Sequence, residues 1–309
     1  MTFQQLEYIV AVDEHRHFVN AATACGVTQS TLSSTIAKLE QEVDVIIFDR
    51  SKHPIEPTTL GKKLISQARV ILHNSKQLRD MVQSEKDSDR GSLFIGIIPS
   101  VSPYLYPYMA RQMKALYPNV TTTVNEDYAP VLIEKLQRAE LDMALVSNVD
   151  IQDTNLLEIE LYNERFMLYA SQASPLWQRE WVRPEDLMGS DMWTLRAFHD
   201  HYQQLSSYVH RENFHTTTFD HGSLSTLIQL VDTNGGCTLI PELFRLALTP
   251  EQQRNLRPIQ GPRFFRTISL VIRRDYMRER MLNIIADVVK RIVPAEMLST
   301  RISKYKIQL

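Results

Sequence analysis

The sequence predicts an α/β protein: an N-terminal winged helix-turn-helix, a long linker helix, and a C-terminal domain of two doubly wound lobes. Three observations carry this prediction. Helix starts and stops follow one another closely in residues 1–45. Residues 59–85 keep a helical pattern of apolar residues, which Ser75 weakens. From residue 93 onward, apolar strand segments alternate with helical ones, as in βαβ units.

The size and composition of the chain limit its class. Its 309 residues exceed what one hydrophobic core usually fills, which indicates two or three domains. No apolar run approaches the roughly 18 residues that a membrane span requires, and the start, MTFQQLEYIVAVDEHRH, is too charged for a signal peptide. We therefore expect a cytoplasmic protein without a membrane partner. A net charge of -2 means that any contact with nucleic acid must come from a local basic patch.

The N-terminal residues are expected to form three short helices. Thr2 can cap the first helix, with Gln5 reaching back in a capping box. The apolar stripe of that helix consists of Phe3, Leu6, Ile9 and Val10. The alanine-rich segment 18–25 ends at Gly26, which suits a left-handed helix cap. Thr28 caps a third helix after a turn of about three residues, which is the helix-turn-helix arrangement.

The third helix has a short, polar outer face. At about 100° per residue, Leu32, Ile36 and Leu39 point inward. Hydroxyls and amides on the other side let a helix enter the major groove, where Gln and Ser can bond base edges and the positive end of the helix dipole faces phosphate. An ordinary solvated helix face is the alternative. The candidate DNA-binding residues here are Thr28, Gln29, Ser30, Ser33, Ser34 and Lys38.

Residues 46–61, IIFDRSKHPIEPTTLG, are typical of a two-stranded wing with a basic turn. Basic residues outnumber the single acid, Glu56, between positions 50 and 69: they are Arg50, Lys52, Lys62, Lys63 and Arg69. Such a patch suits phosphate contacts, although a solvated surface loop would look similar. We take Arg50, Thr58 and Lys62 as further candidate DNA-binding residues.

The helix that follows the wing carries a heptad seam about three repeats long. The seam consists of Leu64, Ala68, Ile71, Ser75, Leu78 and Val82. Two copies of the chain are expected to pair along it, although a helix packed on its own chain would show a similar pattern. The polar segment 85–92 is the best linker candidate. The expected domains are therefore 1–58 for the winged helix-turn-helix, 59–91 for the dimerising linker helix and hinge, and 92–309 for the regulatory part.

The regulatory part alternates strand and helix. Strands are expected at 93–98, 120–124, 143–147, 166–170, 216–219, 237–240 and 268–272, and helices at 104–116, 131–138, 224–231 and 277–292. Two small lobes with a cleft between them fit this length better than one sheet. Lobe I is expected at about 92–162 and 266–300, and lobe II at about 163–265. Ligands in such folds sit beyond the carboxyl ends of strands.

The segments FVNAATACGVTQSTLSSTIAKLEQEV (18–43) and FDRSKHPIEPTTLG (48–61) resemble the winged helix-turn-helix of LysR-type transcriptional regulators. The resemblance extends over residues 1 to about 300. It implies binding to double-stranded promoter DNA, dimerisation through the linker helix, assembly as a tetramer, and a C-terminal domain similar to periplasmic binding proteins. Two departures, Ser30 in place of the family's proline and Pro57-Thr58 in place of its Leu-Thr, leave the preferred operator sequence open.

Within this family, GIIPSVSPYLYP, LDMALVS and GSLSTLIQLVDTNGGCTLIPEL look most like the branch of peroxide-sensing, OxyR-like activators. That branch implies thiol chemistry, but Asp200 and Val209 stand where its two cysteines are expected. The chain has only Cys25 and Cys237, so a disulfide switch of that kind is excluded. Because Cys237 enters a β-branched strand, we expect it to be buried rather than reactive.

The resemblance places a small-molecule effector between the lobes. The candidate effector-binding residues are Pro99, Ser100, Val101, Ser147, Asn148, Phe198, His199, Asp200, His201, Gly236 and Cys237. Hydroxyls and free backbone amides at strand ends suit a carboxylate or another small polar ligand, and ordinary turn chemistry is the alternative for each residue.

Other functions are less well supported. Five of the nine histidines lie between His199 and His221, but they lack acidic or cysteine partners at ligand spacing, so we expect no metal and no cofactor. A pH-sensitive or simply solvated patch suits them better. The chain has none of the common nucleotide-binding, nucleophile-elbow or zinc-protease motifs, so we do not expect an enzyme. A small-molecule receptor without DNA activity is the remaining alternative, and it leaves the helix-turn-helix unexplained.

Overall fold

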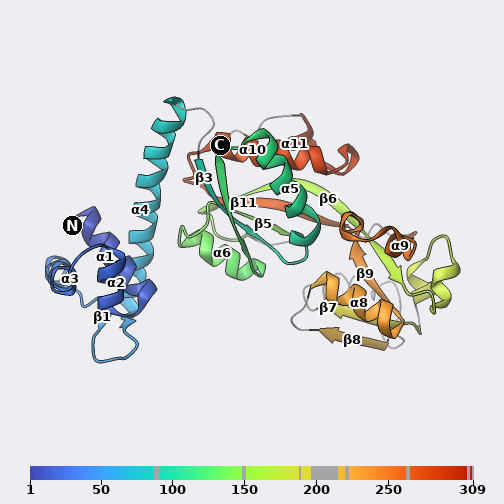
Figure 1. Ribbon diagram of the computed structural model, residues 1–309, viewed down its shortest axis with the longest axis horizontal. Helices are drawn as coiled ribbons and strands as arrows, with labels where there is room; N and C mark the ends of the chain where they lie inside the picture. The colour runs from blue at the N-terminus through green and yellow to red at the C-terminus, as the bar shows by residue number, and fades with distance from the viewer. Residues whose placement is uncertain are drawn as a thin grey trace.

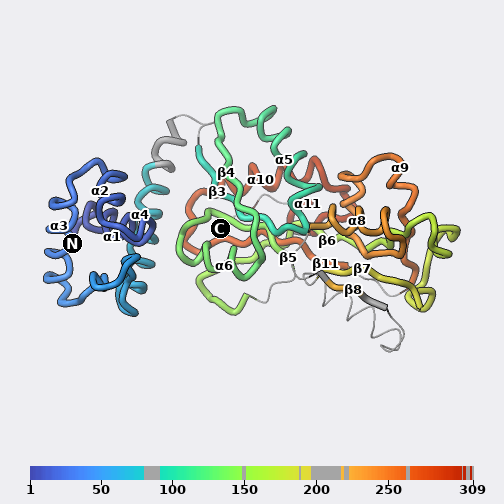
Figure 2. Tube along the Cα trace, turned by 60° about the horizontal axis from the view of Figure 1, so that its bottom comes forward, coloured from blue at the N-terminus to red at the C-terminus, as the bar shows by residue number. Residues whose placement is uncertain are grey.

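The computed structural model describes residues 1–86, 91–147, 151–187, 189–195, 215–219, 223–261, 265–304 and 307. Three parts follow one another along the molecule: an N-terminal head with its long helix, then lobe I, then lobe II (Figures 1 and 2). The head comprises α1 (Phe3–His15), α2 (Phe18–Ala24), α3 (Gln29–Val43), the hairpin β1 (Phe48–Asp49) and β2 (Glu56–Pro57), and the start of α4 (Thr59–Lys86).

The head has a hydrophobic core of its own, to which helix α4 contributes. The capping box at the start of α1 is confirmed, because the Thr2 hydroxyl accepts from the Gln5 backbone while the Gln5 side chain accepts from Thr2. The predicted stripe of α1 differs at one position. Phe3 is exposed, and the buried stripe continues through Val12 instead. The turn between α2 and α3 passes through Gly26, whose φ of +67° lies in the left-handed region that glycine favours.

Helix α4 uses part of its predicted dimer seam within its own chain. Ala68 is 1% exposed and belongs to the core of the head, and Leu64 packs against the same core. By contrast, Ile71 is 40% and Leu78 is 52% exposed. The reason is that α1 packs along the first turns of α4, so only the later part of the seam remains open to a second copy.

Lobe I is built on parallel strands. Its elements are β3 (Gly91–Ile97), α5 (Ser102–Leu116), β4 (Val120–Glu126), α6 (Ala129–Gln137), β5 (Met143–Ser147), α10 (Glu279–Ile292), the short helix η6 (Ala295–Met297) and α11 (Thr300–Lys304). Strand β3 pairs in parallel with both β4 and β5. Helices α5 and α10 lie on one side of these strands and α6 on the other (Figure 1).

Lobe II has a second group of parallel strands. Its elements are η1 (Pro175–Gln178), η2 (Pro184–Leu187), β7 (Asp191–Leu195), β8 (His215–Phe219), α8 (Leu224–Asn234), β9 (Cys237–Pro241), η5 (Glu242–Ala247), α9 (Pro250–Gln253) and β10 (Leu256–Pro258). Strand β7 pairs in parallel with β8 and β9. This arrangement matches the alternation of strand and helix that the sequence predicts.

Two long antiparallel strands, β6 (Leu156–Ala170) and β11 (Phe265–Arg273), join the lobes. They give one continuous order, β4-β3-β5-β11-β6-β9-β7-β8, with β10 paired to β6. The sequence pattern predicts only the second part of β6, because Glu158 and Glu160 interrupt the apolar run before it. Both glutamates are exposed, and the residues that alternate with them point into the core.

Candidate functional site

The outer face of helix α3 is arranged as the sequence predicts. Leu32, Ile36 and Leu39 are buried, and the residues that line the open face are Gln29, Ser30, Ser34 and Lys38. The Thr28 hydroxyl caps the helix by accepting from the Thr31 amide at 3.2 Å. This end of α3 therefore offers short polar side chains beside the positive end of the helix dipole.

Arg50 joins the wing to helix α3. Its guanidinium donates to the Ser33 hydroxyl at 3.3 Å and to the Glu40 carboxylate at 3.1 Å. It also lies over the Phe18 ring, 5.2 Å from the ring centre. The side chain is 44% exposed, so one edge of the guanidinium remains open to a phosphate.

Glu40 sets the start of the wing, a role that helix periodicity alone does not indicate. Its Oε1 accepts from the Ile47 amide at 2.7 Å and from the Phe48 amide at 3.3 Å. The signal that could have found it is its place in the last turns of α3, one chain reversal before the wing. By holding these amides and Arg50 together, Glu40 fixes the wing relative to the recognition helix.

The basic patch of the wing is smaller than the sequence predicts. Lys62 and Lys63 are exposed, whereas Lys52 pairs with Glu56 at 2.6 Å. The Thr58 hydroxyl is engaged by the chain itself, since it donates to the Ile46 carbonyl at 2.8 Å and accepts from the Gly61 amide at 2.9 Å.

Arg69 does not belong to that patch. Its side chain is only 10% exposed and pairs with Asp13 at 3.1 Å, with Glu14 at 3.5 Å and with Glu140 at 3.7 Å. Three carboxylates from distant parts of the chain turn it inward, so it is not available to DNA phosphates in this structure.

A buried polar network occupies the junction between the lobes. Arg266 on β11 donates through Nε to Glu164 Oε1 on β6 at 2.8 Å. Its Nη1 donates to the Ser100 hydroxyl at 2.8 Å, and its Nη2 donates to the Ser100 carbonyl at 3.0 Å. The Tyr104 hydroxyl donates to Glu164 Oε1 at 2.6 Å and lies 3.1 Å from the Tyr162 hydroxyl. The network therefore ties the loop after β3 to both strands that join the lobes.

The protonation states in this network follow from burial and from the ion pair. Burial alone would lower the pKa of Arg266, but Glu164 and the two tyrosine hydroxyls raise it, so the guanidinium stays charged. Burial, followed by Glu164, raises the pKa of Tyr104 well above its usual value. The tyrosines therefore act as hydrogen-bond donors and acceptors without ionising.

The structure brings together one group of the predicted effector residues. Pro99, Ser100 and Val101 follow β3, and Ser147 ends the neighbouring parallel strand β5, so all four lie at the same end of lobe I. Ser100 and Val101 are buried. The predicted residues Asn148, Phe198, His199, Asp200 and His201 lie outside the described residues. The sequence pattern did not indicate Glu164, Arg266, Tyr104 or Tyr162, because the first two sit inside strands and the others on apolar faces.

Gly236 and Cys237 lie away from this junction. Cys237 opens β9 and pairs with Ala170, whereas Pro241 at the other end of β9 pairs with Phe166, close to Glu164. They therefore do not face lobe I as expected, because Gly236 precedes β9 and Cys237 is its first residue, whereas the carboxyl end of β9 points to the junction. Burial, with a smaller contribution from Asp191, raises the pKa of the Cys237 thiol to about 12, so it is inert at neutral pH.

Comparison with known families assigns both parts of the chain. Residues 3–62 match the family described as bacterial regulatory helix-turn-helix protein, lysR family, and residues 86–291 match the LysR substrate binding domain. The chain belongs to the LysR family. It is a LysR-type regulator of transcription that binds DNA through its helix-turn-helix, and this family consists of regulators rather than enzymes.

The relatives of this LysR-family chain include OxyR proteins. It is 34% identical over 303 residues to a hydrogen peroxide-inducible genes activator of Haemophilus influenzae, covering 95% of this chain and 99% of that protein. It is 33% identical over 277 residues to OxyR of Escherichia coli, a DNA-binding transcriptional dual regulator, covering 88% and 90%. A full-length OxyR variant from Pseudomonas aeruginosa has a similar structure, with a TM-score of 0.81, 27% identity, and coverage of 97% and 98%.

Two absences in the described part of the chain bear on other classes of function. None of its helices is long and apolar enough to cross a membrane. Within the same residues, no cluster of three or more His, Cys, Asp or Glu side chains could hold a metal ion. Of the predicted histidine cluster, only the backbone of His215, in β8, falls in the described ranges.

Proposed function

We propose that this regulator senses a small, uncharged polar ligand between its lobes, and that it does so without a disulfide. The observation that carries the proposal is the buried Arg266–Glu164 pair, which the Ser100 hydroxyl and backbone join. Because Glu164 neutralises Arg266, a ligand carboxylate would meet the repulsion of Glu164 as well as the attraction of Arg266. A hydroxyl or amide group avoids that repulsion.

The second carboxylate oxygen of Glu164 supports this choice of ligand. Glu164 Oε2 is buried and accepts no hydrogen bond from any described residue. A buried carboxylate oxygen without a donor costs free energy, and a ligand O–H or N–H would supply the donor. The ligand is thus expected to carry at least one hydrogen-bond donor, with Pro99, Ser100, Val101 and Ser147 beside it.

Thiol sensing does not fit this chain, although its OxyR relatives are named for peroxide. The regulatory part, 92–309, contains a single cysteine, Cys237, so it cannot form a disulfide within itself. The other cysteine, Cys25, lies in the head, where burial first and then Glu7 and Glu14 raise its pKa. Neither thiol is activated toward an oxidant.

The DNA contacts and the assembly complete the proposal. The residues proposed to contact DNA are Thr28, Gln29, Ser30, Ser33, Ser34, Lys38, Arg50 and Lys62. We propose dimerisation through the exposed part of helix α4, which the exposure of Ile71 and Leu78 supports. Membership of the family supports the further proposals of a tetramer and a cytoplasmic location. The proposed divisions remain 1–58, 59–91 and 92–309.

The test is binding of the purified chain to the DNA immediately upstream of its own gene and to scrambled DNA, across a salt series. Specific readout predicts a preference that survives moderate salt. Small hydroxyl- or amide-bearing compounds are then added, alongside small carboxylates. One of the uncharged compounds should change the affinity of the wild type, and Ser100→Ala should weaken that change. A response to peroxide that Cys237→Ser abolishes would instead show that the chain is a thiol sensor.

A further inference from the structure

Helix α4 contacts lobe I of its own chain along one side. Arg69, His73, Asn74 and Gln77 occupy this side, spaced so that they follow one another along the helix. Asn74 donates to Asp275 at 2.9 Å, and the Gln77 side chain accepts from the Met277 amide at 3.0 Å. The linker helix is therefore more than a spacer, because lobe I docks directly on it.

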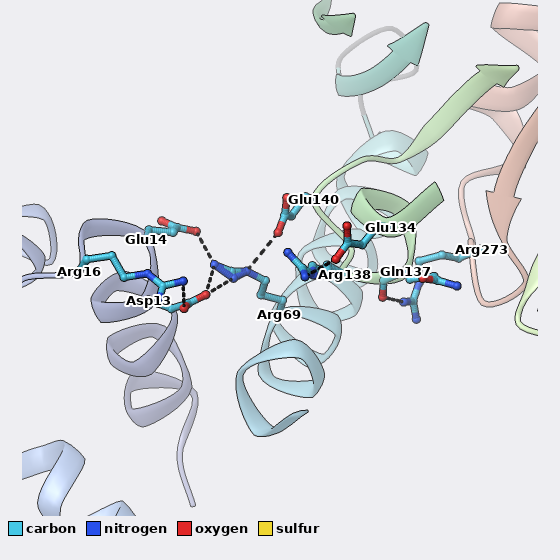
Figure 3. A network of polar contacts seen from close by, with 9 residues as sticks. All are labelled: Asp13, Glu14, Arg16, Arg69, Glu134, Gln137, Arg138, Glu140 and Arg273. Carbon is cyan, nitrogen blue, oxygen red and sulfur yellow. Dashed lines mark hydrogen bonds and ion pairs between the residues drawn. The ribbon is translucent and has the colours of Figure 1, made fainter. Parts of the chain in front are cut away.

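Arg69 connects three parts of the molecule. It pairs with Asp13 and Glu14 of α1 in the head, and it lies 3.7 Å from Glu140, which precedes β5 of lobe I. Figure 3 shows its guanidinium between the two carboxylates of α1 and the side chain of Glu140. A movement of lobe I relative to the head would have to break or stretch this arrangement.

Asp142 of lobe I forms the second contact with helix α4. It is 2% exposed and accepts from the Phe94 amide at 2.8 Å through Oδ2. Its Oδ1 lies 3.7 Å from Nε2 of His73 on the linker helix and 3.5 Å from Arg278. Lobe I therefore presents a buried carboxylate, held by its own strand β3, to a histidine of the linker helix.

Several polar groups at the contact between helix α4 and lobe I lack a hydrogen bond. A cavity of about 290 Å³ lies between the two sides, lined in part by Arg69, His73, Phe94 and Arg278. Four buried polar atoms at the contact between α4 and lobe I have no hydrogen-bond partner among the described residues: His73 Nε2, Asn74 Oδ1, Gln77 Nε2 and Asp142 Oδ1. Of these residues, His73, Gln77 and Asp142 line the cavity. Such a polar contact adds little net free energy, so the two sides can separate more readily than an apolar core can.

Strands β5 and β11 link this contact to the junction between the lobes. Strand β5 begins directly after Asp142 and ends at Ser147, beside the buried network. Strand β11 carries Arg266 near its start and ends at Arg273, two residues before Asp275. At about 3.3 Å per residue, each strand is a short, rigid connection between the two places.

We propose that Arg69 and His73 are positioning residues: by docking on Glu140 and Asp142 they fix the DNA-binding head relative to lobe I. Displacing β5 at the lobe junction moves these acidic partners, and displacing β11 moves Asp275, the partner of Asn74. Either movement releases or redirects the head. The docking itself does not depend on which ligand the lobes bind, so it can be tested on the free protein.

The test measures the distance from head to lobe I in the full chain. Spin labels are placed at Gln41→Cys on α3 and Lys114→Cys on α5, both exposed positions, in a Cys25→Ser background. Labelled chain is diluted into unlabelled chain so that only distances within one chain are recorded. For the labelled chain that keeps Glu140, we expect a single narrow distribution of distances between the two labels. Glu140→Lys should shift the distance distribution to longer distances and broaden it. Glu140→Asp, which keeps the negative charge, should leave the distribution as in the wild type.

The matched control is Glu134→Lys, the same charge change on α6 of lobe I, where the glutamate pairs with Arg138, the C-cap residue of that helix. It should leave the distance unchanged. Thermal unfolding should be similar for both lysine variants, which separates positioning from folding. If Glu140→Lys destabilises the fold, Glu140→Gln removes the charge more gently. A distance distribution that stays narrow and unshifted in the folded Glu140 variants would overturn the proposal.

Discussion

The guanidinium of Arg266 donates to the carboxylate of Glu164 at 2.8 Å, and the two side chains are only 1% and 0% exposed. They come from β11 and β6, the strands that join the lobes, and the pair lies 102 residues apart in sequence. A charge pair this deep stabilises the protein only while both partners are present, because either partner alone would be a buried, unneutralised charge.

The first prediction concerns this pair. Arg266→Met leaves Glu164 buried and unpaired, so we expect the free energy of unfolding to fall by about 3 to 5 kcal/mol. The measurement is urea unfolding followed by circular dichroism. The double variant Arg266→Met with Glu164→Leu should regain much of the loss, since neither charge remains. Equal losses in the single and double variants would mean that the ion pair is not the source of the stability.

The second prediction separates base readout from phosphate contact. Gln29→Ala on α3 should cost about 1 to 3 kcal/mol on the preferred DNA and reduce the preference over scrambled DNA. Arg50→Ala should weaken binding to both DNAs alike. It should also reduce the slope of the logarithm of affinity against the logarithm of salt concentration by about one. The measurement is fluorescence anisotropy over a salt series.

Two controls test this assignment. Arg50 also touches Ser33 and Glu40, so Arg50→Lys, which keeps the charge but not the two-pronged contact, should fall between the wild type and Arg50→Ala. Arg179→Ala in lobe II should change neither affinity nor salt dependence. An Arg50→Ala variant with unchanged salt dependence would mean that Arg50 serves only the fold of the wing.

The head could be predicted from sequence because its signals are local. Thr2 with Gln5, Gly26 and Thr28 each mark a helix end within a few residues of their partners. Arg69 shows where local reasoning fails: its position suggests a phosphate contact, yet Asp13 lies 56 residues away in sequence and still turns it inward. Contacts between distant segments leave no local pattern.

In the regulatory domain, too, local signals could be predicted from sequence and contacts between distant segments could not. Ser100 and Ser147 could be placed at a site because they follow apolar strands, and strand ends gather at one edge of a parallel sheet. Glu164 and Arg266 could not be placed at the site from sequence, because a charged residue inside a strand is normally predicted to face solvent. Only the pairing of β6 with β11, which sets Arg266 opposite Glu164, makes their burial possible.

The third prediction concerns dimerisation through α4. Because Ile71 and Leu78 are exposed while Ala68 is already buried in the head, the dimer contact should depend on the later part of the helix. Leu78→Glu should therefore weaken self-association, which sedimentation measures over a concentration series. Lys63→Glu, an exposed change off the seam on the same helix, is the control. A dimer that survives Leu78→Glu together with Ile71→Glu would place the contact elsewhere.

The last prediction concerns pH and the docking of α4 on lobe I. Burial lowers the pKa of His73 below its ordinary value of 6.5, and Arg273 and Arg278 lower it further, while Asp142 and Asp275 oppose the shift. Glu140 and Arg69 also border the same cavity. The docked state therefore holds His73 neutral, whereas a released His73 takes up a proton more readily.

The sign follows from this difference. A histidine whose pKa is lowered by docking contributes fully to docking above pH 6.5, and the contribution is lost as the pH falls below that value. The labels at Gln41→Cys and Lys114→Cys should report a narrow distance at about pH 7.5 and a growing released population towards about pH 5.5. His73→Gln, which cannot take up a proton, should remove most of this change. If the His73→Gln variant releases over the same pH range as the wild type, another group controls the transition and His73 has no part in it.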